Sequence, residues 1–140
     1  MYTGSCLCGG VTFEIDGELE PIQMCHCIQC RKAQGTAFVT NIPVQESHFH
    51  LRSGGDLLSA YESSPGKQRV FCKQCGSPVL SKTTALPGVV RVRAGTLDGE
   101  LNTRPAFHIY TDFKANWFDI KDSLPQFATR SVPKNPQPKD

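Results

Sequence analysis

The sequence predicts a single all-β domain, and three observations lead to that prediction. Residues 11–15 (VTFEI) alternate apolar and polar side chains with a period of two, as in a strand with one buried and one solvated face. Turn-forming pairs, Gly54-Gly55 and Asp98-Gly99, separate apolar segments. The chain also contains seven cysteines in closely spaced groups, which is typical of the metal sites that stabilise small domains.

The expected strands follow one another along the domain. Strand patterns occur at residues 11–15, 21–27, 38–44, 49–51, 79–80, 89–92 and 107–110. Pro43 places the third of these segments at the edge of a sheet, because proline cannot donate a ladder hydrogen bond. Residues 28–35 end at a glycine and predict one helical turn, whereas residues 57–61 fit a strand and a helix equally well.

Length and composition indicate one soluble globular domain. The chain has 140 residues, of which 39% are hydrophobic and 20% charged. We expect the domain to span residues 1–127, and the proline-rich residues 128–140 to form a flexible tail. No segment approaches the roughly 18 apolar residues of a membrane span. No signal-peptide pattern precedes Cys6, so we expect a cytoplasmic protein.

The charge distribution argues against a nucleic-acid partner. Fifteen Lys and Arg residues against thirteen Asp and Glu residues leave a net charge of +2, and the pI of about 8.2 is below the range typical of nucleic-acid-binding domains. One or two of the basic residues could still receive an anionic small molecule. Otherwise we interpret them as parts of a mixed, solvated surface: Arg31, Lys32, Lys67, Arg69, Lys73, Arg91 and Arg93.

The cysteines form three groups with the spacing of metal ligands. An odd number cannot pair fully into disulfides, and thiols one or two residues apart suit a shared metal ion. Zinc takes four thiolates in a closed tetrahedral site, so the two outer pairs predict one structural zinc. The middle group predicts a second zinc with an open position; the alternative is one metal site plus a redox or free group. The groups are Cys6 and Cys8, then Cys25, Cys27 and Cys30, then Cys72 and Cys75.

An open zinc held by three thiolates is suited to sulfur chemistry. Its ligands donate charge, so it prefers a soft partner such as a substrate thiolate. We expect such a site to join a thiol to an aldehyde or to cleave a carbon–sulfur bond. His108 could instead complete the metal shell, or His108 or Tyr110 could move the proton. His26 lies between two ligands and would point to the opposite face of a strand, so we do not predict it as a ligand.

With these motifs the chain resembles the family of glutathione-dependent formaldehyde-activating enzymes, which includes the centromere protein V domain. The resemblance rests on GSCLCGG at residues 4–10, CHCIQCR at residues 25–31, FCKQCGS at residues 71–77 and the stretch 104–120. It implies a β-tent fold similar to methionine sulfoxide reductase B, a structural zinc on the outer cysteine pairs and a catalytic zinc on the middle group. It also implies the condensation of glutathione with formaldehyde to S-hydroxymethylglutathione, a carbon–sulfur lyase reaction.

Two hypotheses of different classes follow. The first is a zinc-dependent carbon–sulfur lyase with two zinc ions per chain, acting on a small thiol such as glutathione or on its adduct with formaldehyde or another aldehyde. The second is a non-catalytic, zinc-stabilised module that binds a protein partner. A rubredoxin-type iron site is disfavoured, because one of the outer pairs is Cys-x-Cys rather than Cys-x-x-Cys.

Overall fold

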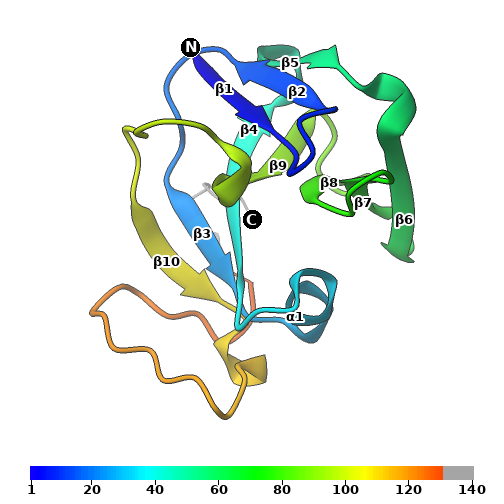
Figure 1. Ribbon diagram of the computed structural model, residues 1–140. Coiled ribbons are helices and arrows are strands. Elements are labelled where there is room, and N and C mark those ends of the chain that lie inside the picture. The colour runs from blue at the N-terminus through cyan, green and yellow to red at the C-terminus, as the bar shows by residue number, and fades with distance from the viewer. Residues whose placement is uncertain (131–140) are drawn as a thin grey trace.

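Ten strands and one α-helix make up the described part of the computed structural model, residues 1–130 (Figure 1). A small antiparallel sheet has the order β1-β2-β5, with β1 (Tyr2–Ser5), β2 (Thr12–Ile15) and β5 (Phe49–Ser53). A larger sheet has the order β10-β3-β4-β9-β8-β7-β6, with β3 (Ile22–Cys25), β4 (Val39–Gln45), β6 (Leu58–Ser64), β7 (Lys67–Cys72), β8 (Pro78–Thr83), β9 (Val89–Arg93) and β10 (Pro105–Ile109). The helices are α1 (Ile28–Gln34) and four 3-10 turns, η1 (Glu46–His48), η2 (Gly55–Leu57), η3 (Ala94–Thr96) and η4 (Thr111–Phe113). The predicted all-β class is confirmed.

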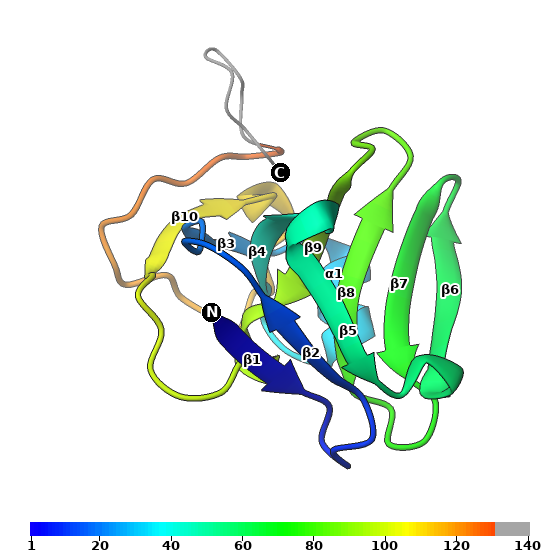
Figure 2. The same cartoon turned by 90° about the horizontal axis from the view of Figure 1, so that it is seen from above.

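Both sheets contribute side chains to one hydrophobic core. Figure 2 shows the small sheet lying over the middle of the larger one. Phe13 of β2 stacks on Phe49 of β5, with ring centroids 5.0 Å apart. Val11, Phe13 and Ile15 are fully buried, which confirms the predicted buried face of this segment. The larger sheet supplies Ile42, Val44, Val79, Leu80, Val90 and Val92 to the same core.

Strand β4 lies inside the larger sheet, so the prediction that Pro43 marks an edge strand is wrong. The register shows why a proline is accepted there. The pairing of β4 with β3 ends at Asn41, whereas its pairing with β9 continues from Asn41 to Gln45. Pro43 therefore has a strand partner only on the β9 side, and its missing N–H does not interrupt the β3–β4 ladder.

Strand β10 lies parallel to β3, and the chain after it folds back along its outer side (Figure 1). Backbone hydrogen bonds join His108 to Phe127 (2.9 Å) and Tyr110 to Thr129 (2.8 Å). The flexible tail predicted for residues 128–140 lies mostly outside the described residues. Within residues 1–130, no helix has the length and apolar character needed to cross a membrane.

Candidate metal centres

Four cysteines from distant parts of the chain meet in a first thiol group. The Sγ atoms of Cys6, Cys8, Cys72 and Cys75 all lie within 4.8 Å of one another. The Sγ atoms of Cys6 and Cys8 are 3.5 Å apart, and those of Cys8 and Cys72 are 3.9 Å apart. Tetrahedral zinc with Zn–S bonds of about 2.3 Å requires sulfur–sulfur distances of about 3.8 Å. The first thiol group therefore has the donors and the size of a closed zinc site.

A tight turn after β7 directs the second cysteine pair toward the first. Gly76 adopts a φ of 82°, which favours glycine, and its N–H donates to the carbonyl of Cys72 (2.7 Å). The hydroxyl of Ser77 lies 3.3 Å from the Sγ atom of Cys75. Hydrogen bonds from Ser77 lower the pKa of Cys75 to about 5, because they stabilise the thiolate. The turn thus favours the charged form that binds metal.

Three further cysteines form a second thiol group where β3 leads into α1. Cys25 ends β3, Cys27 is the N-cap of α1 and Cys30 lies in the first turn of that helix. Their Sγ atoms lie within 4.8 Å of one another, and no other cysteine, histidine or acidic side chain of the described residues joins them. The N–H of Cys30 donates to the Sγ atom of Cys27 (3.3 Å). The second thiol group therefore offers three metal ligands and no fourth.

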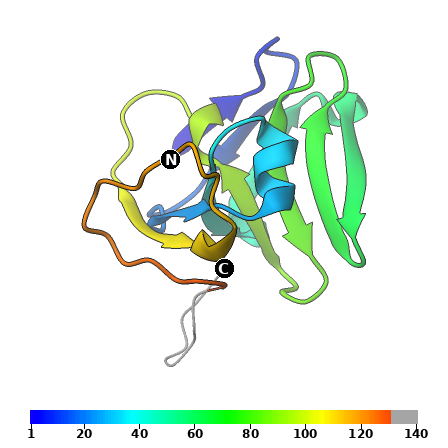
Figure 3. The ribbon, with the colours of Figure 1, turned by 90° about the horizontal axis from the view of Figure 1, so that it is seen from below.

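A cavity of about 520 Å³ lies beside the second thiol group, and all three of its cysteines line the wall. Figure 3 shows α1 in front of the larger sheet, with the η4 turn that follows β10 nearby. Leu86 and Ile109 contribute apolar surface to the cavity, and Tyr110 also lines it. Tyr110 is the one non-glycine residue within residues 1–130 that has a positive φ, at 60°. The geometry thus provides a ligand-sized space next to three potential metal ligands.

Basic side chains surround the second thiol group. Both terminal guanidinium nitrogens of Arg69 lie 3.8 Å from the Sγ atom of Cys30. Hydrogen bonds from the thiols of Cys25 and Cys27 lower the pKa of Cys30, and the positive charges of Arg69 and Lys67 act in the same direction. The pKa of Lys67 is lowered as well, mainly by burial. Without a metal, Cys30 is therefore the thiol of this group that carries negative charge, whereas hydrogen bonds within the group raise the pKa of Cys25.

The interpretation of the basic residues as a solvated surface is wrong for two arginines. Arg69 and Arg93 are only 8% and 4% exposed. Burial is the main cause that lowers the pKa of Arg93 to about 10. The sequence held one signal of this arrangement, because Lys67 and Arg69 are two residues apart in a strand and must share one face.

The structure does not bring His108 to the second thiol group. In the parallel β10–β3 pair, His108 lies opposite Met24 and Ile109 lies opposite Cys25. Neighbouring side chains in register share a sheet face, so His108 points to the face opposite Cys25. His108 is absent from the cavity wall, whereas Tyr110, the other candidate for proton transfer, is part of it. We therefore do not assign His108 to the site.

The two buried histidines instead form a hydrogen-bonded chain that ends at the exposed side chain of Asp122. The Nε2 atom of His26 lies 2.8 Å from Nδ1 of His108, and Nε2 of His108 lies 3.0 Å from Oδ2 of Asp122. Burial, with a smaller effect from His108, lowers the pKa of His26 to about 4, so its ring is neutral at pH 7. The Phe38 ring packs against His26 at 5.1 Å. This chain supports the backbone between Cys25 and Cys27 from the opposite face.

The fold and the two thiol groups define a small β protein that could hold two metal ions through cysteine alone. Residues 1–113 match the family model described as "Glutathione-dependent formaldehyde-activating enzyme", and the chain belongs to that family. The resemblance inferred from the cysteine motifs is thereby confirmed.

Individual relatives agree with this assignment. A Halomonas elongata protein named as a glutathione-dependent formaldehyde-activating enzyme is 29% identical over 130 residues, which cover 86% of this chain and 82% of the relative. An uncharacterized lyase of Schizosaccharomyces pombe is 25% identical over 134 residues, which cover 96% of each chain. The crystal structure of a Rhodobacter sphaeroides protein has a TM-score of 0.62 at 20% identity, over 89% of this chain and 98% of that one. That structure supports the fold.

Proposed function

We propose that this protein is a zinc-dependent carbon–sulfur lyase that acts on a small thiol, such as glutathione, or on the adduct of a thiol with formaldehyde or another aldehyde. Membership of the family and the enzyme names of two relatives support this proposal. The observation that carries it is the second thiol group, which lines a cavity of about 520 Å³ and has no fourth ligand from the described residues.

The two thiol groups have different roles in this proposal. The first group, with four thiols at zinc-like spacing, holds a structural zinc. The second group holds a catalytic zinc, and its donor set fits because the charges of Arg69 and Lys67 favour the Cys30 thiolate. Zinc bound there would supply a soft Lewis acid that keeps the substrate sulfur deprotonated.

The residues around the cavity prepare it for reversible addition of a thiol to an aldehyde. In the condensation, the sulfur forms a bond to the aldehyde carbon, and the proton of the thiol ends on the aldehyde oxygen; the reverse reaction breaks the same carbon–sulfur bond. Tyr110 lines the cavity and is the proposed carrier of this proton. Leu86 and Ile109 exclude water from part of the cavity.

Exchange spectroscopy with ¹³C-labelled formaldehyde and glutathione tests the proposal. The zinc-loaded protein should accelerate the exchange of carbon between free formaldehyde and the S-hydroxymethyl thiol above the spontaneous rate. Cys27→Ser should abolish the acceleration while keeping the fold, because serine is itself a good N-cap for α1. Tyr110→Phe should slow exchange without weakening thiol binding. Equal exchange rates with and without protein, for several thiols, would overturn the proposal.

A further inference from the structure

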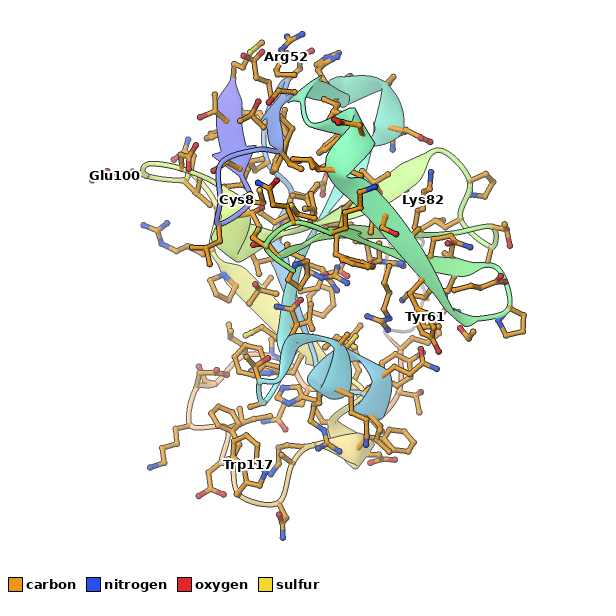
Figure 4. All side chains as sticks on the ribbon, turned by 45° about the vertical axis from the view of Figure 1, so that its right-hand side comes forward. Cys8, Arg52, Tyr61, Lys82, Glu100 and Trp117 are labelled. Carbon is orange, nitrogen blue, oxygen red and sulfur yellow. The ribbon has the colours of Figure 1, made fainter. Side chains whose placement is uncertain are left out.

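One side-chain amide lies in the wall of the cavity beside the second thiol group. Asn41 of β4 lines this cavity, although it is only 5% exposed. Figure 4 shows the space between α1 and the strands above it filled by side chains, several of which carry nitrogen. The backbone of Asn41 pairs with Gln23 of β3 on one side and with Arg93 of β9 on the other. The side chain of Asn41 is therefore the part that reaches the cavity.

The strand register places Asn41 on the same face of the sheet as Cys25. In the antiparallel β3–β4 pair, Val39 lies opposite Cys25, and Asn41 is two residues farther along β4. Residues in register share a face of the sheet, and so do residues two apart in one strand. Cys25 and Asn41 are therefore diagonal neighbours, whose Cα atoms lie about 7 to 8 Å apart. A small ligand held at the thiols can touch the amide.

A buried arginine fixes the orientation of this amide. The Nη1 atom of Arg93 donates to Oδ1 of Asn41, and a guanidinium can only donate, so the amide oxygen must face Arg93. Arg93 is itself held by the hydroxyl of Ser81 (3.2 Å) and by the carbonyl of Arg91 (3.3 Å). A cation bonded to an amide oxygen polarises the amide and makes its N–H a stronger donor. The amide nitrogen of Asn41 points away from this cation.

The amide nitrogen has no hydrogen-bond partner among residues 1–130. The bond to Arg93 is the one side-chain hydrogen bond that Asn41 makes within this part of the chain. An unpaired N–H group in so buried a position costs stability, and a ligand oxygen would satisfy it. The wall that contains Asn41 also contains Cys25, Cys27 and Cys30. The Nδ2 atom thus offers an oriented donor to a ligand at the second thiol group.

We propose that Asn41 is a catalytic residue whose Nδ2–H group donates to the oxygen of the aldehyde. This inference rests on the proposed function, because the aldehyde is a substrate only in that reaction. When the thiolate sulfur bonds to the carbonyl carbon, the π electron pair of the C=O bond moves to the oxygen, which becomes negative. A donor that Arg93 has already oriented stabilises this charge without reorganisation. The proton that Tyr110 carries in the proposed function then neutralises the oxygen.

Two substitutions of Asn41 test this role through the exchange of ¹³C-labelled formaldehyde with glutathione. Asn41→Asp keeps an oxygen for Arg93 but has no N–H, and Asn41→Ala removes the donor without adding charge. Each should slow the protein-catalysed exchange about 100-fold to 1,000-fold, the usual cost of removing one donor to a developing oxyanion. Thiol binding, followed through the absorption bands of the cobalt-substituted chain, should be kept, because the thiol alone carries no aldehyde oxygen.

Asn102→Asp is the matched control, because it makes the same change in an exposed residue between β9 and β10. The exchange rate and the thiol binding of this variant should equal those of the wild type. Circular dichroism checks that every variant folds.

Nuclear magnetic resonance of the wild type tests the hydrogen bond itself and does not depend on how the variants fold. The sample is the zinc-loaded chain saturated with glutathione. Addition of formaldehyde should move the side-chain amide proton of Asn41 downfield, because a hydrogen bond to oxygen deshields the proton. The side-chain amide protons of Asn102 should keep their positions.

The outcomes separate this inference from the proposed function. If the wild type accelerates exchange and either folded Asn41 variant matches its rate, the inference is overturned and the proposed function stands. An Asn41 amide signal that formaldehyde leaves in place also overturns the inference. If the wild type accelerates exchange with no thiol, the proposed function fails and the inference fails with it. Slow exchange with intact thiol binding in both variants, together with the downfield shift, supports the inference.

Discussion

Removing two thiols from either group should show that the two metal centres contribute unequally to stability. One variant combines Cys72→Ser with Cys75→Ser, which detaches β7 from the turn after β1. The other combines Cys27→Ser with Cys30→Ser. The variants are matched, because each removes two ligands, of which one is buried and one is partly buried. A difference between them therefore reports the lengths of the loops that the metals close.

Those loop lengths give the expected magnitude. Cys8 and Cys72 are 64 residues apart, and the chain-entropy relation gives about 4 kcal/mol for a cross-link of that length. The second thiol group spans only residues 25–30, for which the same relation gives about 2 kcal/mol. With zinc bound, we expect the free energy of unfolding of the Cys72/Cys75 variant to be about 2 kcal/mol lower than that of the Cys27/Cys30 variant.

Urea unfolding followed by circular dichroism, with zinc content measured per chain, provides the assay. Excess chelator gives the control, because the difference in free energy between the variants should vanish once neither metal is bound. Equal stability of the two variants in the presence of zinc would contradict this expectation. The first thiol group would then not act as a long-range cross-link.

Three further expectations concern metal content and the buried histidines. Zinc-loaded protein should contain two ions per chain. Mild chelation should remove roughly one of them with the fold intact, because four thiolates hold zinc more tightly than three. One ion per fully loaded chain would contradict the division of the seven cysteines into a four-ligand and a three-ligand site. His108→Ala should lower the free energy of unfolding by about 2 kcal/mol, because the Nε2 atom of His26 loses its partner in a buried site. When cobalt replaces zinc, the change that added thiols cause in the absorption spectrum should be the same in His108→Ala as in the wild type. An altered change would show that His108 acts at the second thiol group. The hydrogen bond from His108 lowers the pKa of Asp122, so the carboxylate stabilises the folded state above its ordinary pKa and this contribution is lost as the pH falls through the lower, folded-state value. In excess chelator and below about pH 4, the free energy of unfolding should therefore depend less on pH in Asp122→Asn than in the wild type. Equal slopes of this free energy against pH in the two proteins would contradict the contribution of Asp122.

Features that depend on neighbouring residues could be predicted from the sequence. The alternation at residues 11–15 identified the buried face of β2, because side chains alternate in any strand. The spacing of Cys25, Cys27 and Cys30 indicated a shared site, since a strand end and one helical turn suffice to bring their Sγ atoms within 4.8 Å. The two outer pairs were expected to meet, although the chain between them is long, because a closed zinc site needs four thiolates and each pair supplies only two.

Features that depend on pairing between distant strands could not be predicted. The place of His108 follows from the parallel register of β10 with β3, which no local pattern specifies. The interior strand β4 accepts Pro43 because the β3–β4 ladder ends at Asn41, and that end point depends on the length of β3. Lys67 and Arg69 share a face by their spacing, but only the position of α1 determines that this face lines a cavity.

The different spans of the two thiol groups also set an order of metal loading during synthesis. The second group is complete as soon as residue 30 has left the ribosome, whereas the first requires residue 75. We expect a nascent chain to acquire the metal of its cavity first and to gain the closed site about 45 residues later. Ribosome-arrested chains that end shortly before and shortly after Cys75 should accordingly bind one and two zinc ions. A nascent chain would then hold the metal of the second thiol group before the first group can cross-link the domain.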